Sequence, residues 1–180
     1  MAIKNKTKYA ILGILSISSG SGYDIKKYCD SVIANVWHEN FGHIYPVLNN
    51  MLAEGLIKRK NEDETTRKKE YEITELGKDE FLSWIAEPTQ YTPARSEFML
   101  KLLFSNHVSE ENRRKMIEDY KTYHLLKYEK FKKMEEDLIQ PIPGITSERK
   151  VYLNATIRYG ILSTEAALTR CDEVITAISR

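Results

Sequence analysis

The sequence predicts a mainly α-helical protein with one small β-hairpin, divided into two domains. Three observations support this fold class. Apolar residues recur at helical spacing along most of the 180 residues. A helix at 40–54 is followed by two short strands that flank a polar loop at 61–68. A break rich in proline and threonine at 88–93 precedes a second half that shows only helical spacing.

The first two helices are separated by a turn that contains two glycines. Residues 7–18 are apolar almost all round, so we expect this helix to be buried on most sides. Gly20 and Gly22 interrupt it. Ser21 and Asp24 are three residues apart and form a capping-box pattern, which predicts that a second amphipathic helix begins there.

The third helix, 40–54, has one apolar face and ends at Gly55, a residue typical of helix C-termini. Pro46 conflicts with a regular helix over the whole range, because proline lacks the backbone N–H and its ring clashes with the preceding turn. Either the helix is kinked at Pro46, or its regular part begins near Tyr45.

A two-stranded hairpin follows, with strands expected at 56–60 and 69–73. Thr74 can cap the next helix, which runs to about Glu87. These elements complete a first domain, which we place at 1–88.

The second domain, 89–180, is predicted to be all helical, with a short apolar helix at 94–105 followed by two long ones. Ser109 and Ser147 can cap the long helices, which extend to about residues 138 and 178. In the last helix, apolar residues recur at steps of three and four, as in a coiled coil. Two long helices alone enclose little interior, so we expect the chain to form a homodimer through this domain.

Composition limits the classes of function. The net charge is +1, so any affinity for nucleic acid must come from a local basic patch. Cys29 and Cys171 both fall in apolar helical patterns and are expected to be reduced, buried thiols. No apolar run approaches the ~20 residues needed to span a bilayer. The N-terminus resembles a signal peptide but lacks a small-residue cleavage site, so we expect a cytoplasmic protein with no membrane partner.

The hairpin carries basic residues beside the loop, and it directly follows a helix. A helix can enter the major groove of DNA while a basic ribbon lies along the flanking phosphates. This arrangement predicts a winged helix-turn-helix domain that binds double-stranded DNA. On the wing, Arg67, Lys68 and Lys69 are the candidate phosphate ligands, although a charge run can also be merely a solvated face.

On the third helix, the candidate DNA-contacting residues are His43, Tyr45, Asn49 and Asn50. Tyr45 and Asn49 are four residues apart and therefore share a helix face. Asparagine can form two hydrogen bonds with adenine, whereas tyrosine more often contacts phosphate or sugar. The alternative is that the Tyr45 ring tucks under the domain and Asn49 is only solvated.

Residues 9–77 resemble the PadR family of bacterial transcriptional regulators. The matching segments are A-I-L-G-I-L, S-G-Y-D-I, G-H-I-Y-P-V-L-N-N-M-L-A-E-G-L-I and R-K-K-E-Y-E-I-T-E-L-G. The second half is similar to the longer members, with E-F-M-L-K-L-L-F and R-Y-G-I-L. The resemblance implies a homodimer that binds an operator and represses a nearby gene. It also implies that Tyr23 and Tyr45 lie at the DNA surface.

Some members of this family are relieved by small aromatic or amphipathic ligands. Trp37, Trp84, Tyr120 and His124 are the residues here that could line such an effector site, or they could simply pack in the core. The family's last helix often carries a tryptophan near Arg170. This chain has arginine there, which weakens the expectation of a stacked aromatic effector.

Other classes of function have weaker support. His38 and His43 mimic a zinc-protease helix, but histidines five residues apart do not share a helix face, so we expect no metal site. We also expect no cofactor and no catalysis. The sequence therefore predicts a sequence-specific transcriptional regulator, a repressor acting as a homodimer on a pseudo-palindromic operator. One alternative is a protein–protein adaptor that uses the winged helix as its interaction module. Another is a drug- or metabolite-sensing module.

Overall fold

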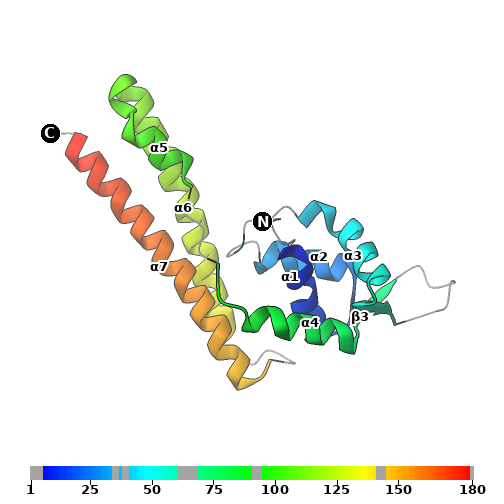
Figure 1. Cartoon of the computed structure of the whole chain (residues 1–180). Helices are drawn as coiled ribbons and strands as arrows, with labels where there is room; N and C mark the ends of the chain where they lie inside the picture. Colours follow the sequence, from blue (N-terminus) through cyan, green and yellow to red (C-terminus); the bar gives the residue numbers. More distant parts are fainter. Residues whose placement is uncertain are drawn as a thin grey trace. The chain divides into compact units, whose positions relative to one another are not determined.

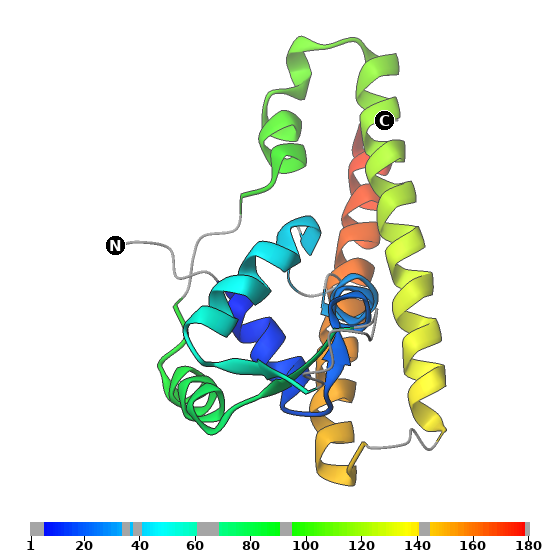
Figure 2. The same cartoon turned by 90° about the vertical axis from the view of Figure 1, so that its right-hand side faces the viewer.

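The chain was analysed as a computed structural model, which describes residues 6–33, 37, 41–60, 69–90, 95–140 and 145–178. It divides into two compact units, Met1–Gln90 and Tyr91–Arg180. We refer to them as the first unit and the second unit. Figures 1 and 2 show both units from two directions.

The core of the first unit is built around α1 (Lys6–Leu15), which packs against α2, α3 and α4 (Figure 1). The helix ends three residues earlier than the sequence predicts. The hydroxyl of Ser16 donates a hydrogen bond to the carbonyl oxygen of Gly13 at 2.7 Å, and serine side chains that bond to the local backbone compete with helix continuation. The ring of Tyr9 stacks on that of Trp84 from α4 (Glu75–Ala86), with centroids 4.5 Å apart.

The predicted capping box is confirmed at the start of α2 (Gly22–Ser31). The Ser21 hydroxyl accepts a hydrogen bond from the Asp24 backbone N–H, and the Asp24 carboxylate accepts one from the Ser21 backbone N–H. Ile25 and Cys29 of this helix are fully buried, so the thiol is part of the core as expected.

The third helix, α3 (Ile44–Ala53), begins two residues before Pro46, which decides between the two alternatives for that residue. A short 3₁₀ turn, η2 (Phe41–His43), precedes it, so Pro46 lies in the first turn, where a backbone N–H has no helical acceptor to lose. An unbroken helix from residue 40 is therefore wrong. At the other end, Gly55 has φ +71°, and the N–H of Leu56 bonds to the carbonyl oxygen of Met51 at 3.0 Å, a Schellman motif.

The predicted two-stranded hairpin is part of a three-stranded antiparallel sheet. Strand β2 (Ile57–Arg59) pairs with β3 (Glu70–Ile73), and β3 also pairs with a two-residue strand, β1 (Gly20–Ser21), that the sequence did not predict. The sheet order is β1-β3-β2. The central strand thus joins the turn before α2 to the base of the hairpin.

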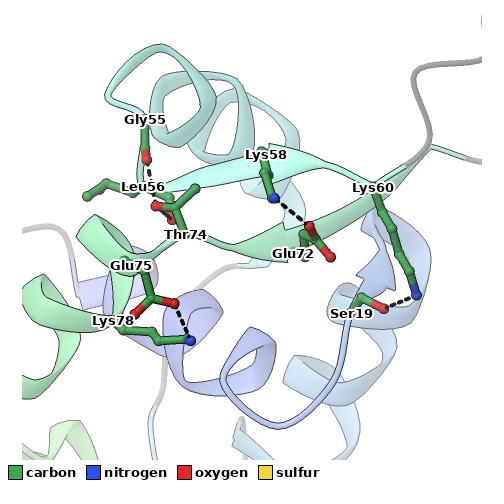
Figure 3. A network of polar contacts seen from close by, with 9 residues as sticks. All are labelled: Ser19, Gly55, Leu56, Lys58, Lys60, Glu72, Thr74, Glu75 and Lys78. Atoms are coloured by element: carbon green, nitrogen blue, oxygen red, sulfur yellow. Dashed lines mark hydrogen bonds and ion pairs between the residues drawn. The ribbon is translucent and has the colours of Figure 1, made fainter.

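Thr74 is the N-cap of α4, as predicted, and it also anchors that helix to the hairpin (Figure 3). Its hydroxyl donates to the carbonyl oxygens of Gly55 at 2.7 Å and Leu56 at 3.0 Å, and accepts from the N–H of Gly77 at 3.1 Å. At the opposite end of β2, beside the hairpin loop, the Lys60 ammonium donates to the Ser19 hydroxyl at 3.1 Å (Figure 3). These contacts hold the helix and the turn to the same strands.

The second unit consists of helices only in its described residues. The short α5 (Glu97–Leu103) and the 3₁₀ turn η3 (Ser105–His107) precede two long antiparallel helices, α6 (Glu110–Ile139) and α7 (Ser147–Ile178). Ser109 caps α6 as predicted. The cap of α7 was predicted at Ser147, but Thr146 accepts the hydrogen bond from the N–H of Arg149 at 3.2 Å instead.

The long helices of the second unit pack along a narrow seam. Phe131 and Leu138 of α6 meet Ile157 and Ile161 of α7 in its core, and Cys171 is buried further along α7. Burial raises the pKa of the Cys171 thiol. No helix among the described residues is both long and apolar enough to cross a membrane.

Candidate functional site

Two tyrosine side chains project from the first turns of α2 and α3. Tyr23 and Tyr45 each occupy the second position of their helix, and their exposed fractions are 66% and 53%. Tyrosine is intermediate in its tendency to be buried, so these exposed rings are available to contact a partner.

The two rings border a groove of about 510 Å³ on the first unit, which we call the tyrosine groove. Three walls form it. The start of α2 contributes Ser21, Gly22 and Tyr23, and α3 contributes Tyr45 and Asn49. The sheet contributes Arg59 and Tyr71, and Lys69 directly precedes β3. The groove therefore brings together four of the residues selected from the sequence: Tyr23, Tyr45, Asn49 and Lys69.

The charge of the tyrosine groove is positive. Arg59 and Lys69 are both exposed, and none of the eight described lining residues carries a carboxylate. Lys58, the neighbour of Arg59, forms an ion pair with Glu72 at 3.0 Å instead (Figure 3). Among the described residues, the groove is thus lined by two cations, Arg59 of β2 and Lys69 just before β3.

Arg59 was not among the residues selected from the sequence. Strand register explains its place: Arg59 lies opposite Tyr71, whereas Lys58 lies opposite Glu72. Directly opposed residues share a face and successive residues alternate between faces, so Arg59 and Lys58 must project to opposite sides. This alternation was available in the sequence once the strand pairing was assumed.

The remaining candidates on the first unit lie outside the groove or outside the described residues. His43, in η2, and Asn50, on α3, are exposed but do not line the groove. Asn50 follows Asn49 by one residue, which rotates it by about 100° around the helix. Arg67 and Lys68 lie outside the described residues, as does His38 of the metal motif considered above.

The candidate effector residues divide between the two units. In the first unit, Trp84 packs between Tyr9 and a shallow hollow of about 220 Å³ that also includes Ile85 and Pro88. Trp37 is partly exposed, and the Lys6 ammonium lies 4.8 Å from its ring centroid.

In the second unit, Tyr120 stacks on Phe98 with ring centroids 3.6 Å apart, and His124 follows at 4.3 Å. Burial first, and then the positive charges of Lys127 and Arg170, lower the pKa of His124. Neither unit by itself brings all four candidates together.

Comparison with known proteins identifies the chain. Residues 11–83 match the model of the transcriptional regulator PadR-like family, and residues 94–179 match the model described as virulence activator alpha C-term. The chain belongs to the PadR-like family of transcriptional regulators. The resemblance inferred from residues 9–77 is thereby confirmed.

One curated relative of this PadR-like chain is the negative transcriptional regulator PadR of Bacillus subtilis (strain 168). The two are 34% identical over 116 residues, and the match covers 62% of this chain and 63% of that protein. The aligned part is thus somewhat less than two thirds of the relative's length.

Solved structures share the fold over nearly the whole chain. The PadR-like transcriptional regulator BC1756 from Bacillus cereus is 26% identical, with a TM-score of 0.80 over 96% of this chain and 97% of that one. Bacillus subtilis PadR in complex with operator DNA is 23% identical, with a TM-score of 0.83 over 97% and 99%. The same protein in complex with p-coumaric acid is 25% identical, with a TM-score of 0.77 over 96% and 98%.

Proposed function

We propose that this chain is a repressor that binds double-stranded DNA through the tyrosine groove and the adjoining hairpin, as a homodimer on a pseudo-palindromic operator. The observation that carries the proposal is the groove itself. It combines exposed polar side chains of a helix with two cations and no carboxylate among its described lining residues. Such a surface suits a polyanion whose base edges are read by a helix. The operator-bound structure of Bacillus subtilis PadR supports this use of the fold.

The groove residues divide into two roles. Asn49 lies on the exposed face of α3 and can form a bidentate pair with adenine, worth about 1–3 kcal/mol of discrimination. Tyr23 and Tyr45 contact phosphate or sugar at the edges of the tyrosine groove. Arg59 and Lys69 bind phosphates on the hairpin side.

The other candidates flank this surface. His43 and Asn50, both exposed beside Tyr45 and Asn49, contact the neighbouring backbone of the duplex. Arg67 and Lys68 directly precede Lys69 in the sequence and are proposed as further phosphate ligands.

Dimerisation is assigned to residues 89–180 and DNA binding to residues 1–88. The helices of the second unit carry large apolar side chains that are exposed in the chain taken alone: Leu100, Leu103, Leu126, Tyr152 and Tyr159. Covering them with a second copy would remove much apolar surface from water. Two-fold symmetry would then place two α3 helices in successive major grooves, roughly 34 Å apart.

A small aromatic acid is the proposed effector, in line with the p-coumaric acid bound to Bacillus subtilis PadR. Trp37 and Trp84 of the first unit, and Tyr120 and His124 of the second unit, are two separate candidate pairs for contact with it. Such a ligand can release DNA only if it binds one dimer shape more tightly than the other. It would act by changing the separation of the two α3 helices.

The test compares a charge reversal at Lys69, which lines the groove, with a charge reversal at Lys58, which does not. Duplexes are first selected by the wild-type protein from a random-sequence pool. Lys69→Glu should weaken binding to selected and unrelated duplexes alike, and should reduce the slope of log affinity against log salt by about 1. Lys58→Glu is the matched control, because Lys58 faces away from the groove toward Glu72.

Equal losses for the two variants would mean that only net charge matters, and the groove would be rejected as the site. Failure of the wild-type protein to select any duplex would favour the protein–protein adaptor instead. A third variant, Asn49→Ala, should relax the selected motif at one base pair. An unchanged motif would remove Asn49 as a reader of bases.

A further inference from the structure

Gly22 and Tyr45 approach each other more closely than a side chain at position 22 would permit. A Cβ atom built on Gly22 would lie 2.7 Å from Cε1 of Tyr45 and 3.4 Å from its Cδ1. The Leu48 side chain would also be 3.4 Å away. The ring of Tyr45 therefore rests directly on the backbone at the first residue of α2.

Backbone conformation does not require glycine at this position. Among the described residues, only Gly55 has a positive φ. Gly22 is the first residue of an α-helix, where alanine is the better helix former. The space taken by the Tyr45 ring is thus what excludes a side chain here.

The Tyr45 ring can move without disturbing the core. About half of it is exposed, and it borders the tyrosine groove. A methyl group at position 22 would push the ring toward solvent, because the other side of the contact is the backbone of α2. Such a displacement changes the shape of the groove while the buried residues Ile44 and Leu48 on the same helix stay in place.

We propose that Gly22 is a positioning residue for Tyr45: the missing side chain at the start of α2 seats the ring in the orientation with which α3 meets DNA. This inference rests on the proposed function of the tyrosine groove and deepens it. It places one determinant of DNA affinity on α2, outside the helix that reads the bases.

A double-mutant cycle tests the proposal in the full-length protein. Binding of one selected duplex is measured for wild type, Gly22→Ala, Tyr45→Ala and the double variant. Tyr45→Ala should weaken binding about tenfold, as expected for the loss of one specific contact. Gly22→Ala should weaken it about five- to tenfold, but by less than about twofold when Tyr45 is already alanine.

Gly20→Ala is the matched control. Gly20 lies two residues earlier in the same turn, and a Cβ there would meet Asp24 at 3.5 Å and Ile25 at 4.0 Å, which are ordinary contacts. Its DNA affinity should equal that of wild type. Thermal unfolding of Gly22→Ala should stay within about 3 °C of wild type, because the exposed ring gives way rather than the core.

The outcomes separate the two proposals. An unchanged affinity of Gly22→Ala, an equal loss in both backgrounds, or unfolding of the variant would each overturn the positioning role while leaving the groove intact. An unchanged affinity of Tyr45→Ala would instead remove Tyr45 from the DNA contact, and the positioning role would fall with it.

Discussion

Replacing Gly77 with alanine should strongly destabilise the first unit. Gly77 lies in the first turn of α4, and a Cβ there would be 2.0 Å from the backbone carbonyl oxygen of Leu56 and 3.0 Å from Ile73. A carbonyl group at the base of a strand cannot rotate away as a side chain can. The start of α4 and the base of the hairpin would have to separate.

The cost follows from the contacts that this separation would break. Ordinary C···O contacts are about 3.3 Å or longer, so the helix must move by about 1.3 Å. Thr74 joins the same elements through hydrogen bonds to Leu56 and Gly77. Loss of its capping bond costs about 1 kcal/mol, and a similar amount is expected for the bond to Leu56. With residual overpacking, the free energy of unfolding should fall by about 3–4 kcal/mol.

Urea unfolding followed by tryptophan fluorescence measures this loss. Both tryptophans of the chain, Trp37 and Trp84, belong to the first unit, so the signal reports on that unit. Gly20→Ala is the control, since its added methyl group makes only ordinary contacts. If Gly77→Ala stays within about 1 kcal/mol of that control, the close approach does not constrain the fold.

Two further predictions concern the second unit. A Cβ at Gly160 would lie 2.3 Å from Cε1 and Cζ of Phe131, whose exposed fraction is 3%, so the ring cannot swing into solvent as Tyr45 can. Gly160→Ala should therefore lower the free energy of unfolding by about 1–3 kcal/mol, measured by thermal unfolding followed by circular dichroism. Adding Phe131→Leu should restore part of the lost stability. No loss in the single variant, or no rescue in the double variant, would contradict the packing argument. The second prediction concerns His124, whose pKa is lowered in the folded state. The unfolded chain therefore binds the proton more readily, and stability falls as the pH drops below the unfolded-state pKa of about 6.5. Urea midpoints should fall between about pH 7.5 and 5.5, and His124→Gln should reduce that decline; an identical decline in the variant would show that another group titrates.

The sequence was most informative where one residue type satisfies a local backbone requirement. The capping box at Ser21 and Asp24, the N-caps Thr74 and Ser109, and the left-handed Gly55 were all predicted and are all observed. Each depends on hydrogen bonds or dihedral angles within a few residues, which a single sequence contains.

Features that depend on distant residues were missed. Strand β1 has only two residues, and two residues carry no detectable alternation. Its partner strand is far along the chain, since Gly20 lies opposite Tyr71, 51 positions later. The place of Arg59 in the groove depends on the register of β2 against β3, in which Arg59 lies opposite Tyr71. At the start of α7, Thr146 and Ser147 can both cap a helix, and the sequence does not distinguish between neighbours of equal capacity.

The exposed apolar side chains of the second unit affect how DNA occupancy depends on the concentration of the chain. In the proposed homodimer a second copy covers this surface, and dimer formation then follows mass action. If only the pair holds both halves of an operator, occupancy at low levels should rise roughly with the square of the chain concentration. For the proposed repressor, halving synthesis would then lower repression about fourfold, so the dimer contacts of the second unit would set the threshold at which a gene is released.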